Sequence, residues 1–192
     1  MSGAHGHGHI EVEGNNKKIA LLISVLALFL ALVETMAKGA QTNALSYNIE
    51  ASNLWSFFQA KTIRQTVVRT AGEMADLNRV PDVDPEASDA LVKRTDTWAK
   101  TMARWESEPE TGEGRKELIA RAKAAEEKRD TATAKHHHYE VSSAAFQIAI
   151  VLASATVITG AMVLTWLSIG LGVIGLIFAG IGLLAPHAVH LL

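Results

Sequence analysis

Long runs of apolar residues alternate with polar sequence along this chain. The first run covers residues 19–37, with Lys17 and Lys18 before it and Lys38 after it. As a helix it would reach about 28 Å, close to the hydrocarbon thickness of a bilayer. A signal peptide is the alternative, but no small-x-small cleavage site clearly follows the run. We therefore predict a transmembrane helix at residues 19–37.

Two further apolar runs cover residues 144–166 and 167–185, and Pro186 follows them. Only a few residues around 166–170 are left to turn the chain, which predicts an antiparallel hairpin. Small residues recur at spacings of three and four in both runs: Ala145, Ala149, Ala153, Thr156 and Gly160 in one, and Ser168, Gly172, Gly175, Ala179 and Gly182 in the other. Because lipid provides no hydrophobic drive between helices, small residues hold helices together by close approach. We expect these stripes to face each other or a neighbouring subunit.

The region between the spans, residues 38–143, has helical rather than strand-like periodicity. Prolines and acidic residues divide it into predicted helices at about 41–78, 85–108 and 114–143, the last able to continue into the second span. One face of the first helix carries apolar and small residues at helical spacing: Leu45, Ile49, Ser52, Ser56, Ala60, Ile63, Val67, Ala71 and Met74. A second set of large apolar residues is predicted to pack in an oligomer or another interface: Leu54, Trp55, Phe58, Trp98 and Trp105.

The predicted fold class is therefore an all-α membrane protein. It has a His-rich N-terminal tail at 1–18, one N-terminal span, an extramembrane helical domain, a C-terminal transmembrane hairpin and a tail at 186–192. The distribution of charge agrees, because residues 38–140 hold 16 of the 18 Lys and Arg and 17 of the 20 Asp and Glu. The long apolar runs outside this region contain almost no charged residue, which excludes an ordinary soluble domain. The net charge of −2 argues against a nucleic-acid partner, and the absence of cysteine excludes disulfides and thiolate sites.

Histidine is the main candidate for chemistry in this sequence. His5, His7 and His9 lie in the tail, and His136, His137 and His138 form a run before the second span. Imidazole binds zinc, copper or nickel, so a metal site is one hypothesis. Three adjacent helical residues point about 100° apart, however, so they cannot all hold one ion. The alternative is polar or interfacial histidine with some pH sensitivity.

Two polar residues fall in or near the predicted spans, and no catalytic motif accompanies them. Glu34 lies in the last turn of the first span and Gln147 lies early in the second. A carboxylate near the headgroups and an interhelical hydrogen bond are the simpler interpretations, and a functional intramembrane acid is the alternative. Phosphate loops, nucleophile elbows and dinucleotide-binding glycine patterns are missing. We expect no enzyme activity and no cofactor.

Two blocks of sequence resemble an uncharacterised bacterial membrane-protein family, domain of unknown function 4337. One block is EASNLWSFFQAKTIRQ at residues 50–65, and the other combines HHHYE at 136–140 with FQIAIVLAS at 146–154. A His-rich tail before the first span adds to the resemblance. The resemblance implies a bacterial inner-membrane protein with one N-terminal span, a helical domain and a C-terminal hairpin. It implies no catalytic residue.

The leading functional hypothesis is a structural or scaffolding protein of the bacterial inner membrane. Its partners would be the lipid bilayer and either copies of itself or a larger membrane complex. A channel or transport component and a metal-handling accessory protein are the alternatives. The positive charges nearest the spans lean toward a cytoplasmic helical domain.

Overall fold

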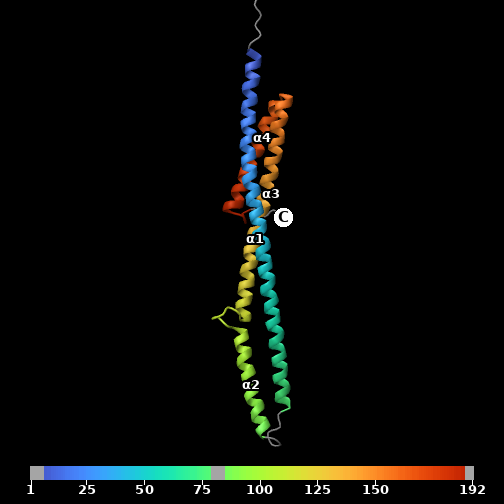
Figure 1. Ribbon diagram of the computed structural model, residues 1–192, viewed down its shortest axis with the longest axis vertical. Coiled ribbons are helices and arrows are strands. Elements are labelled where there is room, and N and C mark those ends of the chain that lie inside the picture. Colours follow the sequence, from blue (N-terminus) through green and yellow to red (C-terminus); the bar gives the residue numbers. More distant parts are fainter. Residues whose placement is uncertain (1–6, 79–84, 189–192) are drawn as a thin grey trace, which may run out of the picture. The chain divides into compact units, whose positions relative to one another are not determined.

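The computed structural model describes residues 7–78 and 85–188 and contains four helices in them, with no strand. The helices are α1 (His7–Leu77), α2 (Pro85–Glu106), α3 (Arg115–Thr159) and α4 (Met162–Leu184) (Figure 1). The chain divides into two units. The apolar unit comprises Met1–Ala44 and Asp130–Leu192, and the polar unit comprises Leu45–Arg129. The helices α1 and α3 each contribute to both units.

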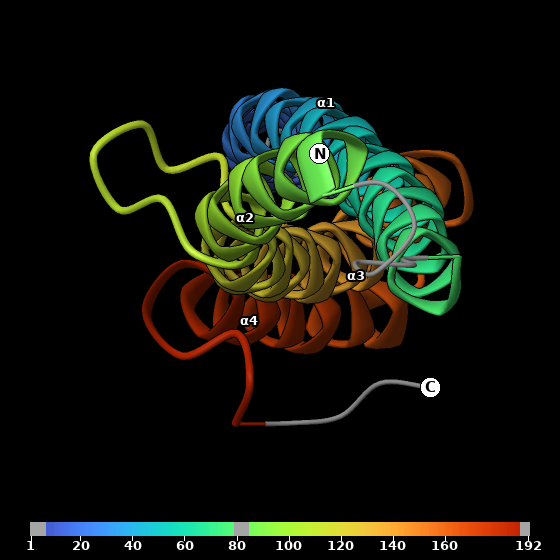
Figure 2. The same cartoon turned by 90° about the horizontal axis from the view of Figure 1, so that it is seen from below.

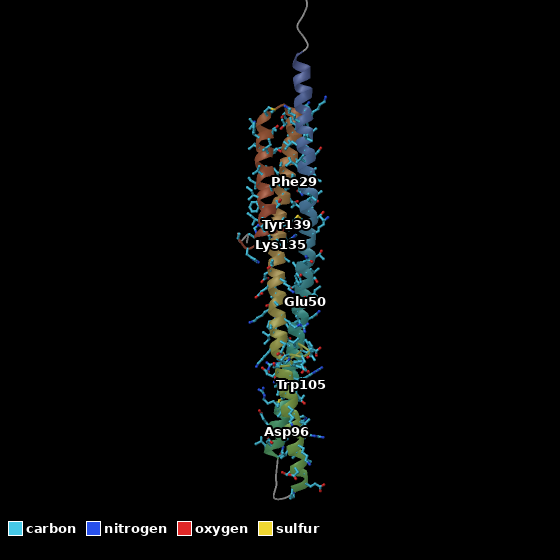
Figure 3. All side chains as sticks on the ribbon, turned by 90° about the vertical axis from the view of Figure 1, so that its left-hand side faces the viewer. Phe29, Glu50, Asp96, Trp105, Lys135 and Tyr139 are labelled. Atoms are coloured by element: carbon cyan, nitrogen blue, oxygen red, sulfur yellow. The ribbon has the colours of Figure 1, made fainter. Side chains whose placement is uncertain are left out.

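The apolar unit is a bundle of α1, α3 and α4, in which α4 packs against α3 (Figure 2). Its core contains Phe146 and Ala149, which are fully buried, together with Leu26, Val33 and Tyr139. The rings of Phe29 and Phe146 stack with their centroids 6.0 Å apart. Phe29 and Tyr139 are labelled in Figure 3, where both lie in this bundle. Helices α1, α3 and α4 are each long and apolar enough to cross a membrane.

The turn between α3 and α4 lies at Gly160 and Ala161, and not at residues 166–170 as predicted. Gly160 has a φ of +70°, a conformation that residues with side chains rarely adopt. The hydroxyl of Thr159 accepts a hydrogen bond from the Ala161 N–H at 3.3 Å, which closes the turn. Helices commonly end with a glycine in the left-handed conformation. Gly160 directly after Thr159 is therefore the residue that indicates the end of α3. Trp166 consequently lies inside α4, where it is exposed.

Helix α1 passes from the apolar unit into the polar unit as a single helix of 71 residues. The sequence predicts a tail at 1–18 before a span at 19–37, but residues 7–18 are helical and belong to α1. Extending an existing helix avoids the unfavourable nucleation step. His5 lies outside the described residues. The structure confirms that α3 continues without a break from the polar sequence into the second apolar run.

The polar unit pairs the second part of α1 with α2 and with the first part of α3. Leu118, Ala122 and Ala125 of α3 are buried against Ala51 and Leu54 of α1. Five residues that share one face of α2 are only half-buried: Leu91, Thr95, Trp98, Met102 and Trp105. Among its residues Ser88 alone is fully buried. The contact of α2 with the unit is therefore looser than that of α3.

Candidate functional site

The small-residue stripes of α3 and α4 face the inside of the apolar unit. Ala145, Ala149 and Ala153 are buried on α3, and Gly172, Gly175 and Gly182 are buried on α4. A Cβ atom placed on Gly175 would lie 3.0 Å from the ring of Phe146. Ala179 packs against the same core. Gly160 is the exception, because it forms the turn and no atom would lie within 4 Å of a Cβ there.

Buried hydroxyl groups connect α4 to α3 at two levels. The hydroxyl of Ser142 donates to the carbonyl oxygen of Gly175 at 2.7 Å, and that of Ser168 donates to Ala149 at 2.7 Å. Both serines are fully buried. A hydroxyl group in an apolar surrounding needs a partner, and the close approach of small residues brings a backbone carbonyl within reach. These two hydrogen bonds align α4 along α3.

A polar pocket opens between α1 and α3 where the apolar run of each helix ends. Its volume is about 400 Å³. We call this the polar pocket, and nine residues line it: Glu34, Ala37, Lys38, Gln41, His136, Glu140, Ser143, Ala144 and Gln147. Their spacing of three and four residues on each helix places two facing rows on its walls. The pocket thus brings together the two polar span residues singled out in the sequence, Glu34 and Gln147, and one histidine of the run.

Hydrogen bonds cross the polar pocket at both ends. The side-chain amide of Gln147 donates to Glu34 Oε1 at 3.4 Å and to Ser143 Oγ at 3.3 Å. At the other end, His136 Nδ1 lies 3.2 Å from the Ala37 carbonyl oxygen. His136 Nε2 lies 3.3 Å from Glu140 Oε1. Glu34 and Gln147 therefore act as partners of each other across α1 and α3.

The three histidines of the run have different environments. His136 faces the polar pocket, and His137 Nδ1 lies 3.6 Å from Glu140 Oε2. His138 is buried at 1% exposure, and its Nε2 lies 3.0 Å from the Pro186 carbonyl oxygen. Since a carbonyl only accepts, Nε2 carries the hydrogen, and Nδ1 is left without a hydrogen-bond partner. His138 therefore holds the end of α4 against α3.

A metal site at the histidine run finds no support in the described part of the chain. No group of three or more His, Asp or Glu side chains there is arranged to hold a metal ion. The physical reason is the helical spacing, which turns neighbouring side chains to different sides. The structure leaves His5 undescribed, and it describes only the backbone of His7 and His9.

Three of the large apolar residues predicted for an oligomer contact or another interface pack against α3 of the same chain. Leu54 is buried, and Trp55 and Phe58 pack against the same cluster with α3. The indole Nε1 of Trp55 also donates to Glu126 Oε1 of α3 at 2.9 Å. Alanines on α3, at 122 and 125, leave room for these side chains. Of the two predicted alternatives, an oligomer contact or another interface, the structure thus places Leu54, Trp55 and Phe58 in an interface between α1 and α3 of one chain.

A stripe on the opposite side of α1 is left exposed by the described residues of the polar unit. We call it the outer stripe, and its members are each more than half exposed: Leu45, Ile49, Ile63, Val67 and Met74. They belong to the face that the sequence analysis identified from its periodicity. At 100° per residue this face is centred about 180° away from buried Leu54 and Gln65. One helix thus presents one apolar face to its own chain and another to the surroundings.

A network around Arg115 was not foreseen from the sequence. Its Nη1 lies 2.6 Å from both Gln65 Oε1 and Glu106 Oε2, and its Nε donates to Thr62 Oγ1 at 3.1 Å. The guanidinium also lies over the ring of Phe58, 5.1 Å from its centroid. Three helices meet in this network, and no local spacing links its members. Only the tertiary structure could identify it.

The chain matches one protein family, described as Domain of unknown function (DUF4337), over residues 15–185. It belongs to that family. The resemblance noted in the sequence is thereby confirmed, and the match includes the three apolar runs and the polar pocket of the DUF4337 chain. No curated protein matches the chain, and no solved structure does.

Proposed function

We propose that this protein is a scaffold of the bacterial inner membrane that crosses the bilayer three times and assembles with copies of itself. Membrane insertion is supported by three apolar helices and by the outward-facing apolar side chains of the apolar unit, including Leu28, Leu32, Ile148 and Val151. At 23 residues, α4 would reach about 34 Å, enough for a hydrocarbon core of about 30 Å. The positive charges near the spans favour a cytoplasmic polar unit.

The observation that carries self-assembly is the outer stripe of α1. Lipid does not explain it, because the stripe belongs to the polar unit, beyond the apolar run of α1. Exposed apolar patches of this kind mark sites of protein association. The face repeats every 11 residues, as in Leu45, Ser56 and Val67 and again in Ile49, Ala60 and Ala71. This period is close to that of a straight helix, so the stripe stays on one side of α1 throughout.

A second copy of the chain is the partner that fits this stripe. Copies held by the same spans in one membrane have the same orientation, so their α1 helices would run parallel. In a parallel pair, each residue of the stripe lies opposite its own counterpart. The stripe and its neighbours between residues 41 and 60 carry one charged side chain, Glu50, so repulsion between identical surfaces is small over this half of the stripe.

Disulfide cross-linking tests this arrangement directly, because the chain contains no cysteine. Ile63→Cys and Met74→Cys each introduce one thiol on the outer stripe. We expect oxidation in native membranes to give covalent dimers of both variants. Glu73→Cys is the matched control, since its side chain points about 100° away from that of Met74. Equal cross-linking of Glu73→Cys, or a monomeric mass in mild detergent, would refute self-assembly through the stripe.

A further inference from the structure

We propose that the polar pocket binds the headgroup of a phospholipid that carries a primary ammonium group, of the phosphatidylethanolamine type. The pocket lies where the apolar runs of α1 and α3 end, which is the level of the headgroups if these runs cross the bilayer. This inference therefore rests on the proposed membrane insertion. It does not depend on self-assembly, because the lining residues all belong to one chain. The volume of about 400 Å³ lies within the usual range of small-ligand sites, about 300–1,000 Å³.

The charges of the polar pocket have two signs, and this selects the class of ligand. Glu34 and Glu140 contribute carboxylates from facing helices, and Lys38 contributes an ammonium group one turn from Glu34. A simple anion would meet two carboxylates, and a simple cation would meet Lys38. A ligand with both a positive and a negative group satisfies both walls. A phosphate next to an alkylammonium group is such a ligand.

The contacts of His136 shape one wall of the pocket. Its Nδ1 faces the Ala37 carbonyl and its Nε2 faces the Glu140 carboxylate. Both partners are hydrogen-bond acceptors, so the ring links Glu140 on α3 to the backbone of α1. His136 therefore holds Glu140 beside the pocket, and Lys38 is the cationic group that can receive the phosphate.

The type of amine follows from the groups available to receive it. A primary ammonium group donates three hydrogen bonds, and Glu34, Glu140 and the amide oxygens of Gln41 and Gln147 are acceptors. A quaternary ammonium group donates none and is bound by aromatic faces. No aromatic ring other than that of His136 lines the pocket. The lining thus favours ethanolamine over choline.

The acyl chains of such a lipid have apolar surface next to the pocket. Leu30 on α1 and Val151 on α3 lie in the apolar runs one turn from Glu34 and Gln147 on the same helix faces; Leu30 is partly exposed and Val151 more than half exposed. A headgroup in the pocket therefore leaves the chains beside these residues. A water-soluble ligand of the same headgroup chemistry would gain nothing from them. This contact favours the lipid over free phosphoethanolamine.

Native mass spectrometry of the purified protein in mild detergent can measure this preference. Three lipids with identical acyl chains would be added in turn: phosphatidylethanolamine, phosphatidylcholine and phosphatidylglycerol. We expect phosphatidylethanolamine to bind about tenfold more tightly than the other two lipids. This difference is typical of one set of charge-assisted hydrogen bonds. Free phosphoethanolamine at equal concentration should bind far more weakly. Equal binding of the three lipids, a preference for phosphatidylglycerol, or equal binding of free phosphoethanolamine would overturn the proposal.

Two sets of variants assign the binding to the polar pocket. Glu34→Gln combined with Glu140→Gln should lower ethanolamine lipid binding to the level of the choline lipid, and Lys38→Gln should weaken both lipids about equally. Glu50→Gln and Lys135→Gln are controls that each remove a single charge outside the pocket, and both should keep the preference. Retention of the preference in the double variant would contradict the site. If that variant fails to fold, the three-lipid comparison on the wild type still decides.

Membrane extraction separates a failure of this inference from a failure of the proposed function. A wild-type protein released from membranes by alkaline carbonate would refute membrane insertion itself. A protein that stays inserted but shows no lipid preference would refute only the headgroup site.

Discussion

Gly182 on α4 offers a sharp test of how closely the helices of the apolar unit pack. A Cβ atom at this position would lie 2.8 Å from Tyr139 Cε1 and 3.0 Å from His138 Cβ. Neither atom can move away freely, because one belongs to a buried ring and the other lies next to the α3 backbone. Gly182→Ala therefore forces α4 away from α3 or displaces the Tyr139 ring.

The matched control is Gly180→Ala, two residues earlier on the same helix. No atom would lie within 4 Å of a Cβ at Gly180. Both variants gain the helical preference of alanine over glycine, about 0.5–1 kcal/mol. Only Gly182→Ala also forces a methyl group into a packed site, and such overpacking typically destabilises a protein by about 1–3 kcal/mol. The difference between the two variants is thus the overpacking energy alone, about 2 kcal/mol in the middle of that range.

Thermal unfolding in detergent, followed by tryptophan fluorescence, measures this difference. For a chain of this size, 1 kcal/mol shifts the midpoint by about 2–4 °C, so Gly182→Ala should melt about 4–8 °C below Gly180→Ala. Gly180→Ala should melt at or slightly above the wild type. Equal midpoints for the two alanine variants would show that α4 does not approach α3 closely at Gly182, and the packing argument would fail.

Three further predictions concern single interactions. Arg115→Met should lower the free energy of unfolding of the polar unit by about 2 kcal/mol in denaturant titrations, since it leaves Oε1 of the buried Gln65 without its donor; an unchanged midpoint would argue against the network. Hydrogen bonds from the Ser107 hydroxyl and a backbone N–H lower the pKa of Glu117. The stability that they add is present above the ordinary value of 4.5 and is lost as the pH falls through the lower, folded value. The protection factors for hydrogen exchange in the loop before α3, which are corrected for the intrinsic pH dependence of exchange, should therefore fall on acidification, and Ser107→Ala should shift that fall to higher pH; the same profile in both proteins would contradict it. Ser168→Ala should destabilise the hairpin by about 0.5–1 kcal/mol relative to the wild type in detergent unfolding, whereas no loss would mean that its hydrogen bond to α3 is unimportant.

Much of the helical architecture could be read from local patterns. Prolines and acidic residues before α2 mark its start, and the apolar runs mark the helices that are long enough to span a membrane. The stripes of small residues predicted which faces of α3 and α4 pack. These features depend on residue spacing along one helix, so the linear order of residues contains them.

Contacts between helices could not be predicted in the same way. The aromatic residues at 54–58 looked like a surface for other chains, yet α3 covers them, and the outer stripe on the opposite side is the exposed one. Both faces of α1 are apolar enough to be buried, and periodicity does not say which one meets the chain's own α3. The turn at Gly160 was missed because a glycine in an apolar run fits a packing stripe as well as a helix end.

By itself the sequence determined that the chain is helical, where its apolar runs lie, and that it belongs with a family that shares its motifs. Tertiary structure alone decided which face of α1 is left uncovered, and that Glu34, Lys38, His136 and Glu140 line one pocket. The physical reason is that helix formation and apolar burial are encoded by neighbours within a few turns. The polar pocket and the Arg115 network depend instead on the relative rotation of helices whose contacting residues lie up to about a hundred positions apart.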